Sequence, residues 1–291
     1  MKPSDQKVRT RPRVPQGAPH FLIVGSCKSG TTNLYDDLAV HPDVFMPSNK
    51  EPDILHRAHN AEDALRLWRS HFSSAKAGDI LGEGSTYYTM NPQFPDVSEF
   101  ALTVLGEDAR IIYLMRDPIQ RIKSHLGHDI AVGRSSGQDF DKMALEEERF
   151  VSWSDYSFQI KPWIKAFGRE NILPLIFEDY ISDRHETVKK VAAFIGINPE
   201  KLPRREAISN SRQSLRAVPS VLKPMMPFIY HPIFGKIVPQ SYRTKLRKAL
   251  TRKINVNEIS LKTETCNEIK RRLKHLPEDL RKQKIEPGSW F

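Results

Sequence analysis

The stretch HFLIVGSCKSGTTNLYDDLAVH, residues 20–41, decides the fold. It opens with an apolar run over residues 21–24, short enough to be a buried strand. A loop of small polar residues with one cation follows over residues 25–32, and Leu34 and Leu38 then recur at helical spacing. A strand, a loop and a helix start in this order aim several backbone N–H groups at one point, where the helix dipole adds positive potential. The stretch therefore predicts a phosphate-binding loop.

The rest of the chain repeats this alternation of apolar runs and helical periodicity. Further strands are predicted over residues 43–46, 79–83, 110–115 and 172–177. Helices are predicted over residues 61–72, 100–105, 118–132, 140–150, 157–167 and 183–195. Asp117 is a good N-cap and Pro118 a good first helical residue. Alternating strands and helices indicate a three-layer α/β fold, with a central parallel sheet flanked by helices.

The two ends of the chain differ from this core. Residues 1–19 contain several prolines and predict a disordered lead-in. One domain is expected over residues 20–291, with an α/β core over 20–215 and a basic, proline-rich and helical portion over 216–291. Within that portion, residues 258–276 predict a basic amphipathic helix, whereas five prolines in residues 218–239 forbid a regular spanning helix.

Composition limits the class of protein. Its 291 residues are 39% hydrophobic, enough for a full core. Two cysteines make no disulfide framework, so a reducing compartment is expected. Because the chain has no run of 18 uncharged apolar residues and no signal-peptide core, we expect a cytoplasmic protein.

The positive charge is concentrated in the last third. Residues 201–291 hold 21 Lys and Arg against 7 Asp and Glu, whereas residues 1–200 hold 24 against 28. Either this is a solvated basic face, or it meets an anionic cosubstrate, acidic glycan, nucleic acid or membrane. The apolar segment 218–239 is a candidate for peripheral membrane contact beside a lipid-linked acceptor, or for a lid over the acceptor cleft.

The loop departs from the phosphate loop of nucleoside triphosphatases. Gly25 and Gly30 have the spacing of GxxxxGK[ST], but Thr31 stands where that motif has lysine, and the only lysine is Lys28. A Mg²⁺ site of that kind also needs a carboxylate after a buried strand, and Asp117 is committed to capping a helix. Both observations argue against triphosphate hydrolysis.

Two motifs together resemble the sulfotransferases that use 3′-phosphoadenosine 5′-phosphosulfate (PAPS). The first is the loop after the first strand, and the second is Arg116-Asp117-Pro118 after a strand, with Ser124 eight residues after the arginine. The resemblance implies that Arg116 and Ser124 bind the 3′-phosphate of PAPS. It also implies that the loop binds the 5′-phosphosulfate through Lys28, Ser29, Gly30, Thr31 and Thr32.

Further segments are similar to the glycan-modifying branch of that family. Lys50-Glu51-Pro52 resembles a turn whose glutamate is the proposed base, and residues 82–87 resemble a Gly-Glu-Lys-Ser-Pro-x-Tyr segment, here with Gly84 in place of the lysine. The lysine- and glycine-rich phosphate loop of the cytosolic branch is absent from the last third. Residues 208–212, with Arg212, are the candidate replacement among the 3′-phosphate ligands.

Sulfuryl transfer requires a base for the acceptor hydroxyl, a charge on the leaving phosphate oxygen and in-line placement of the reactants. Glu51 is the candidate base and Lys28 the candidate for the leaving oxygen, and no metal is required. Glu83, Tyr87, His125 and Asp129 are candidates for the acceptor site, and all but the tyrosine are rival bases. These candidates also have structural interpretations. Lys28 is then a solvated loop lysine, Glu51 part of a polar turn, and Tyr87 a packed tyrosine. His125 and Asp129 are then ordinary residues of the cleft wall.

Three functions remain distinct on these grounds. The favoured one is sulfuryl transfer from PAPS, leaving 3′,5′-adenosine bisphosphate (PAP), to a hydroxyl or amine of a glycan, glycolipid or small metabolite. The second is a nucleotide kinase with an altered phosphate loop. The third is a nucleic-acid-binding protein that uses the basic last third, but the chain has no RNP-like, zinc-finger or aromatic–basic pattern, and no nucleic-acid partner is expected.

Overall fold

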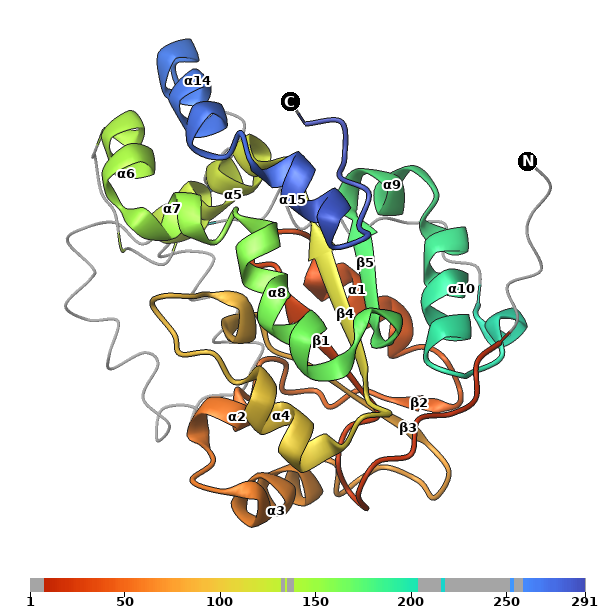
Figure 1. Cartoon of the computed structure of the whole chain (residues 1–291). Helices are drawn as coiled ribbons and strands as arrows, with labels where there is room; N and C mark the ends of the chain where they lie inside the picture. Colours follow the sequence, from red (N-terminus) through yellow and green to blue (C-terminus); the bar gives the residue numbers. More distant parts are fainter. Residues whose placement is uncertain are drawn as a thin grey trace.

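A five-stranded parallel sheet in the order β2-β3-β1-β4-β5 forms the centre of the protein (Figure 1). The structure is a computed structural model that describes residues 8–131, 134, 139–203, 216–217, 252–253 and 259–290. All five predicted strands are present: β1 (Phe21–Gly25), β2 (Val44–Phe45), β3 (Ile80–Gly84), β4 (Arg110–Met115) and β5 (Ile172–Ile176). A separate antiparallel pair joins β6 (Arg216–Ala217) to β7 (Arg252–Lys253).

Helices cover both faces of the sheet, which confirms the predicted three-layer fold. On one face, Phe21 and Ile23 pack in a cluster with residues of α1 (Thr31–Leu38) and α10 (Arg184–Phe194). On the other, Leu22 and Val24 pack in a cluster with residues of α4 (Ser98–Leu105) and α8 (Tyr156–Phe167). This division follows from the alternation of side chains along a strand.

The other helices surround the ends of the sheet. They are α2 (Ile54–Arg57), α3 (Ala61–His71), α5 (Pro118–Ala131), α6 (Phe140–Glu146), α7 (Glu148–Ser152), α9 (Phe177–Ser182), α14 (Thr263–Arg272) and α15 (Leu276–Lys282). The described residues also form three short 3₁₀ helices: η1 (Thr86–Thr89), η2 (Arg169–Asn171) and η3 (Pro199–Lys201). As predicted, Pro118 begins α5 and Asp117 caps it, accepting a bond of 2.7 Å from the Gln120 N–H.

Two helix predictions need correction. The single helix predicted over residues 140–150 is broken at Glu147, whose backbone is extended. After this break the Arg149 guanidinium reaches both the Glu147 carboxylate at 2.5 Å and Asp129 at 2.7 Å. The helix predicted over residues 258–276 begins only at Thr263 and ends at Arg272, and α15 follows it.

The described part of the predicted disordered lead-in, residues 8–19, contacts the core. The Arg9 N–H donates to the Ala193 carbonyl at 3.0 Å, and the Arg9 guanidinium donates to the Glu170 carbonyl at 2.7 Å. The Arg11 guanidinium donates to the Gly78 carbonyl at 2.9 Å, and Ala18 is fully buried. Hydrogen bonds to the C-terminal end of α10, to η2 and to the residues before β3 thus hold this segment, which apolar periodicity alone did not reveal.

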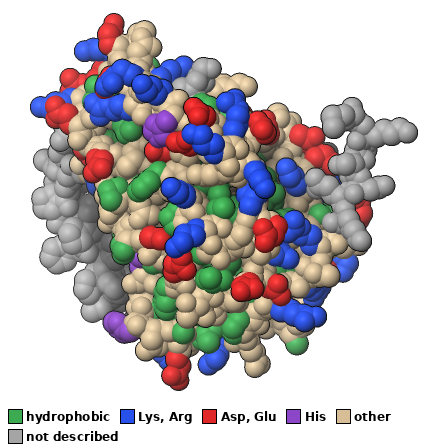
Figure 2. Space-filling model, in the orientation of Figure 1, with side chains coloured by type: hydrophobic (Ala, Val, Ile, Leu, Met, Phe, Trp, Pro, Cys, Tyr) green, Lys and Arg blue, Asp and Glu red, His purple; other side chains and the backbone are tan. Residues whose placement is uncertain are grey.

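Of the described C-terminal helices, α15 packs on α8 and α14 on α6, and both present charge outward. Leu273, Leu276 and Leu280 are buried in the same cluster as α8. Figure 2 shows Lys and Arg gathered over the end of the molecule that carries α14, with Asp and Glu among them. Residues 259–290 hold eight Lys and Arg against five Asp and Glu, and with residues 201–203, 216–217 and 252–253 the described residues carry half of the excess charge of the last third.

In the part of the chain that the structure describes, no helix combines the length and apolar character needed to cross a membrane. The segment 218–239, predicted as a membrane contact or a lid, and Arg212, predicted as a 3′-phosphate ligand, both lie outside the described residues.

Candidate active site

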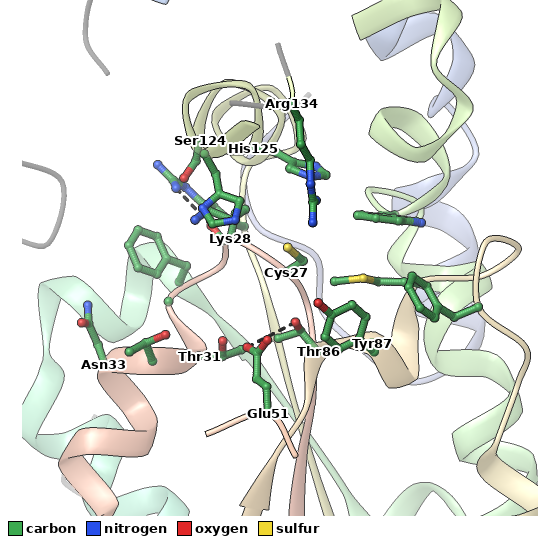
Figure 3. A pocket seen from close by; sticks show the side chains of 18 of the residues that line it. Cys27, Lys28, Thr31, Asn33, Glu51, Thr86, Tyr87, Ser124, His125 and Arg134 are labelled. Atoms are coloured by element: carbon green, nitrogen blue, oxygen red, sulfur yellow. Dashed lines mark hydrogen bonds between the residues drawn. The ribbon is translucent and has the colours of Figure 1, made fainter. Parts of the chain in front are cut away.

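A cavity of about 540 Å³ opens beyond the carboxyl ends of β1, β3 and β4. This is where the chain passes from strands on one side of β1 to strands on the other, and open α/β sheets bind ligands at such a switch point. In Figure 3, Lys28 and Ser124 lie toward the top of the view, and Glu51, Thr31 and Thr86 toward the bottom. The cavity thus gathers predicted site residues from segments nearly 100 positions apart.

The β1–α1 loop forms one wall of the cavity. Gly30 precedes α1 with φ 91°, and a Cβ there would lie 2.6 Å from the Phe177 ring, so the position requires glycine. No side chain caps the start of α1, which leaves the N–H groups of its first turn available to a ligand. Thr31 and Thr32 line the cavity beside these groups, as the loop motif predicts.

Ser29 is placed differently from the other predicted loop ligands. Its side chain is fully buried, its hydroxyl pairs with that of Ser26 at 2.6 Å, and its N–H donates to the Ser26 carbonyl. Ser29 does not line the cavity. Its contacts therefore hold the loop closed rather than reach a bound ligand.

Lys28 enters the cavity from a backbone with φ 68°, in the left-handed region that non-glycine residues rarely adopt. Burial lowers the pKa of its ammonium, while the Glu51 carboxylate favours the charged form. The neighbouring Cys27 also lines the cavity, and burial raises the pKa of its thiol. The loop therefore presents a partly desolvated cation beside an unreactive thiol.

Arg116 and Ser124 reach the cavity from the end of β4 and from α5. Arg116 is buried, its guanidinium donates to the Lys28 carbonyl at 3.3 Å, and it stacks over the Phe177 ring at 4.8 Å. The Tyr156 hydroxyl donates to the Arg116 carbonyl at 2.7 Å. The second predicted phosphate motif is thus joined directly to the first.

Glu51 lies in the turn between β2 and α2 and faces the loop across the cavity. Its φ is 60°, and its N–H donates to the Gly84 carbonyl at 3.0 Å, which fixes the turn on the end of β3. The Thr86 hydroxyl approaches its carboxylate at 3.4 Å. Among the described residues that line the cavity, Glu51 is the only carboxylate.

Glu83, a predicted acceptor-site residue and rival base, is separated from the cavity. Only 1% of it is exposed, and it accepts hydrogen bonds from the Trp68 indole, the Ser85 hydroxyl at 2.8 Å and the Tyr88 hydroxyl at 2.6 Å. Burial raises the pKa of this carboxyl, although the three donors lower it. Glu83 therefore ties α3 and η1 to the sheet.

His125 and Asp129 share one face of α5, as their spacing predicts, but neither is placed to act as a base. His125 lines the cavity between two guanidinium groups, with Arg121 at 3.5 Å from Nδ1 and Arg149 at 3.3 Å from Nε2. Burial and these two cations hold the pKa of His125 far below its usual range. Asp129 is fully buried, and Arg149 lies 2.7 Å from its carboxylate.

Gly84, where the resembling segment has a lysine, ends β3 beneath Tyr35. A Cβ at this position would lie 3.0 Å from the Tyr35 ring, whose hydroxyl donates to the Pro47 carbonyl. A longer side chain at position 84 would displace this tyrosine from the turn that carries Glu51.

The side of the cavity away from the loop is apolar and aromatic. It includes Tyr87, which was predicted, and Met90, Phe94 and Trp153, which were not. Two nitrogen-bearing side chains, His128 and Arg134, were also missed. His128 follows Ser124 by one helical turn, and this spacing on α5 was the available signal. The aromatic residues carry no such signal, because they come from separate segments.

Asp117 remains outside the cavity. Its carboxylate caps α5, and no other acidic group follows β4 directly into the site. The arrangement of a Mg²⁺-dependent triphosphatase is therefore absent from the described part of the cavity.

The chain is similar to a known domain family and to several known proteins. The sequence model of the sulfotransferase domain family matches residues 18–255. Human carbohydrate sulfotransferase 15 is 27% identical over 297 residues, which cover 77% of this chain and 51% of that protein. Heparan sulfate glucosamine 3-O-sulfotransferase 3B1 from Mus musculus is 24% identical over 188 residues, with 62% and 46% covered. The chain spans about half the length of the curated relatives it matches.

A solved structure gives the same result for the fold. The crystal structure of a sulfotransferase from Alicyclobacillus acidocaldarius superposes with a TM-score of 0.56 at 25% identity, covering 67% of this chain and 88% of that one.

Proposed function

Because the chain belongs to the sulfotransferase family, we propose that it transfers the sulfuryl group of PAPS to a hydroxyl of a carbohydrate acceptor. One observation carries the proposal: Lys28, Arg116 and Ser124 meet in a cavity in which Glu51 is the only carboxylate among the described lining residues. A bisphosphorylated donor needs two separate anion sites, and transfer to a hydroxyl needs a base opposite them.

The two phosphate motifs supply the anion sites. The 5′-phosphosulfate would lie against the first turn of α1, held by Thr31, Thr32 and the free N–H groups there. The 3′-phosphate would lie between the Arg116 guanidinium and the Ser124 hydroxyl. The direct bond from Arg116 to the loop supports a fixed distance between the two sites.

The chemistry is a single displacement at sulfur. The acceptor oxygen forms a bond to sulfur as the bond from sulfur to the bridging phosphate oxygen breaks, leaving PAP. The acceptor proton passes to the Glu51 carboxylate, and the Lys28 ammonium stabilises the charge on the departing oxygen. Lys28 is suited to this role because a partly buried ammonium acts on a nearby charge with little screening.

The acceptor class is inferred from the relatives and from the lining of the cavity. Carbohydrate and heparan sulfate sulfotransferases are among the relatives. Tyr87, Phe94 and Trp153 offer apolar ring faces, against which a sugar ring can pack. Hydroxyls of glycolipids and small metabolites remain the other acceptors to be screened.

Ligand-induced thermal stabilisation tests the donor assignment. PAP is expected to raise the melting temperature without added Mg²⁺, because ligand binding to the folded state stabilises it. A shift seen only with ATP and Mg²⁺ would contradict the proposal and favour a kinase. Radiolabelled PAPS, offered with panels of glycans, glycolipids and phenols, then identifies the acceptor.

A pair of variants tests the base. Glu51→Gln should retain PAP binding and lose transfer by a factor of about 10²–10⁴, the usual contribution of general-base catalysis. His128→Asn is the matched comparison, since burial and Lys28 lower the pKa of this imidazole and leave it neutral beside the cavity. If His128→Asn loses transfer while Glu51→Gln retains it, the base role passes to the histidine.

A further inference from the structure

The side chain of Lys50 connects the start of α1, where the donor is proposed to bind, to Glu51, the proposed base. Its ammonium lies 2.9 Å from the Thr32 hydroxyl, 3.3 Å from the Thr31 hydroxyl and 3.0 Å from a Glu51 carboxylate oxygen. An ammonium has three N–H donors, so these three contacts use all of them. One cation therefore bridges the start of α1 and the carboxylate across from it.

The backbone around Lys50 is built to hold this position. Glu51 and Asp53 both have left-handed φ values, 60° and 53°. The Glu51 N–H donates to the Gly84 carbonyl, and the Asp53 N–H donates to the Ser85 hydroxyl at 3.1 Å, so both backbone positions are fixed. Backbone strain of this kind persists only where surrounding contacts determine it. The turn is thus anchored to β3 independently of the lysine.

Lys50 stands behind the wall of the cavity. Thr31, Thr32 and Glu51 line the cavity, whereas Lys50 does not. Only 18% of the Lys50 side chain is exposed, against 32% for Glu51. An ordinary surface ion pair is worth about 0–1 kcal/mol and leaves both partners mobile. In the ion pair of Lys50 and Glu51, the ammonium also donates to the Thr31 and Thr32 hydroxyls on α1. These contacts constrain the distance between α1 and the Glu51 carboxylate.

We infer that Lys50 is a positioning residue that aligns the donor-binding hydroxyls of α1 with the Glu51 carboxylate. The inference rests on the proposed sulfuryl transfer and assigns a role to a side chain that does not line the cavity. Because Lys50 donates to the hydroxyl oxygens of Thr31 and Thr32, the hydroxyl protons are left to donate to an anion in the cavity. The same ammonium holds one Glu51 oxygen and leaves the other to accept the acceptor's proton.

Substitution of Lys50 tests this role. Lys50→Met should lower kcat by about 100-fold, since misplacement of reacting groups by about 1 Å has effects of this size. The acceptor KM should change by less than about threefold, because Lys50 does not reach the acceptor half of the cavity. Lys50→Arg keeps the charge and several donors and should recover part of the lost kcat.

A double-mutant cycle separates positioning from a merely structural role. If Lys50 acts through Glu51, Lys50→Met should lower the residual kcat by less than about fivefold in a Glu51→Gln background. An undiminished 100-fold loss in that background would overturn the inference. A second double-mutant cycle combines Lys50→Met with Thr32→Val and measures PAP affinity. The losses of affinity caused by the two substitutions should likewise not be additive.

Lys189→Met is the matched control. Lys189 also forms an ion pair with a carboxylate, Glu200 at 2.8 Å, and its side chain is 24% exposed, but it lies on α10 away from the cavity. This variant should keep wild-type kcat. If Lys50→Met does not fold, Lys50→Gln and Lys50→Arg carry the same test, and equal kcat in wild type and all folded Lys50 variants would reject the role.

The outcomes also separate this inference from the function on which it rests. Absence of transfer by the wild-type protein would reject the proposed function. Wild-type transfer combined with unchanged kcat in the Lys50 variants would reject only the inference about Lys50.

Discussion

The two ends of the cavity are built in different ways. The end proposed for the donor consists of a loop, a helix start and Arg116, all placed directly after β1 and β4. The end proposed for the acceptor consists of Tyr87 in η1, which follows β3, and of Phe94 and Trp153, which follow no strand of the sheet directly. Groups close to strand ends, Tyr87 among them, leave a pattern in the sequence, whereas Phe94 and Trp153 come from separate segments and leave none.

The boundary between the two ends is held by short charged contacts. Lys50 connects the loop to Glu51, as described above, and His56 connects the turn that carries Glu51 to the segment that carries Phe94. The His56 ring contacts the Asp53 carboxylate at 2.6 Å through Nδ1 and the Pro95 carbonyl at 3.0 Å through Nε2. Perturbing each end separately should therefore give different kinetic signatures, while perturbing the His56 contacts should affect stability.

At the donor end, the largest effect is expected from Lys28→Ala. Transfer should fall by about 10²–10³, because loss of one group that stabilises developing charge typically costs this much in kcat. Initial rates with labelled PAPS measure the change. The control is Lys165→Ala, which removes an exposed lysine paired with Glu99 and should leave the rate unchanged. A Lys28→Ala rate within tenfold of wild type would contradict the assigned role.

Arg116→Ala should change donor selectivity rather than the chemical step alone. Hydrogen bonds to charged groups are worth about 1.5–3 kcal/mol, so PAP affinity should fall by about 10- to 100-fold and approach that of AMP. Calorimetric titration with both nucleotides measures the difference. Arg66→Ala removes an exposed arginine and serves as the control. Unchanged preference for PAP over AMP would place the 3′-phosphate elsewhere.

At the other end, Phe94→Ala should raise the acceptor KM by about tenfold and leave PAP affinity unchanged. Its ring lies 4.9 Å from that of Tyr87, and an aromatic pair contributes about 0.5–1.5 kcal/mol beyond area burial. Phe158→Ala on α8 is the matched control, because that ring is 51% exposed and does not line the cavity. A loss of PAP affinity in Phe94→Ala would show that the two ends are not separable.

The smallest effect concerns pH and His56. Burial opposes the charged imidazolium, but hydrogen bonds to Asp53 and Pro95 outweigh it, and Asp96 adds a further negative charge, so the pKa of His56 is raised above 6.5. Because the folded pKa is raised, the stabilisation is fully present below pH 6.5 and is lost as pH rises through the folded value.

Urea unfolding of wild type and His56→Gln should therefore differ more at pH 5.5 than at pH 9. The difference should be no more than about 1 kcal/mol, the usual range for a partly exposed ion pair. Comparison with the variant cancels the opposite contributions of buried neutral histidines such as His20, whose pKa is lowered to about 4 by burial and by Arg11. A stability difference between wild type and His56→Gln that grows with pH would contradict the raised pKa of His56.

Most of the α/β core could be read from the sequence, because each strand is a short apolar run and each helix has an apolar face. The exceptions have physical causes outside local periodicity. Glu147 breaks a helical pattern so that Arg149 reaches a buried carboxylate, and α9 forms directly after β5 where a longer strand was expected. Residues 8–19 are held by hydrogen bonds to segments far away in the sequence.

The candidate site likewise contains residues that could be predicted from local sequence patterns and residues that could not. The sequence by itself determined the phosphate loop and the second motif, because both depend on where a strand ends and a helix begins. Only the tertiary structure distinguished Glu51, which lines the cavity, from Glu83, which three donors bury, since both glutamates lie near turns rich in small and polar residues. It also decided the role of Lys50, because a contact between α1 and the turn after β2 depends on the packing of the sheet rather than on the spacing of residues.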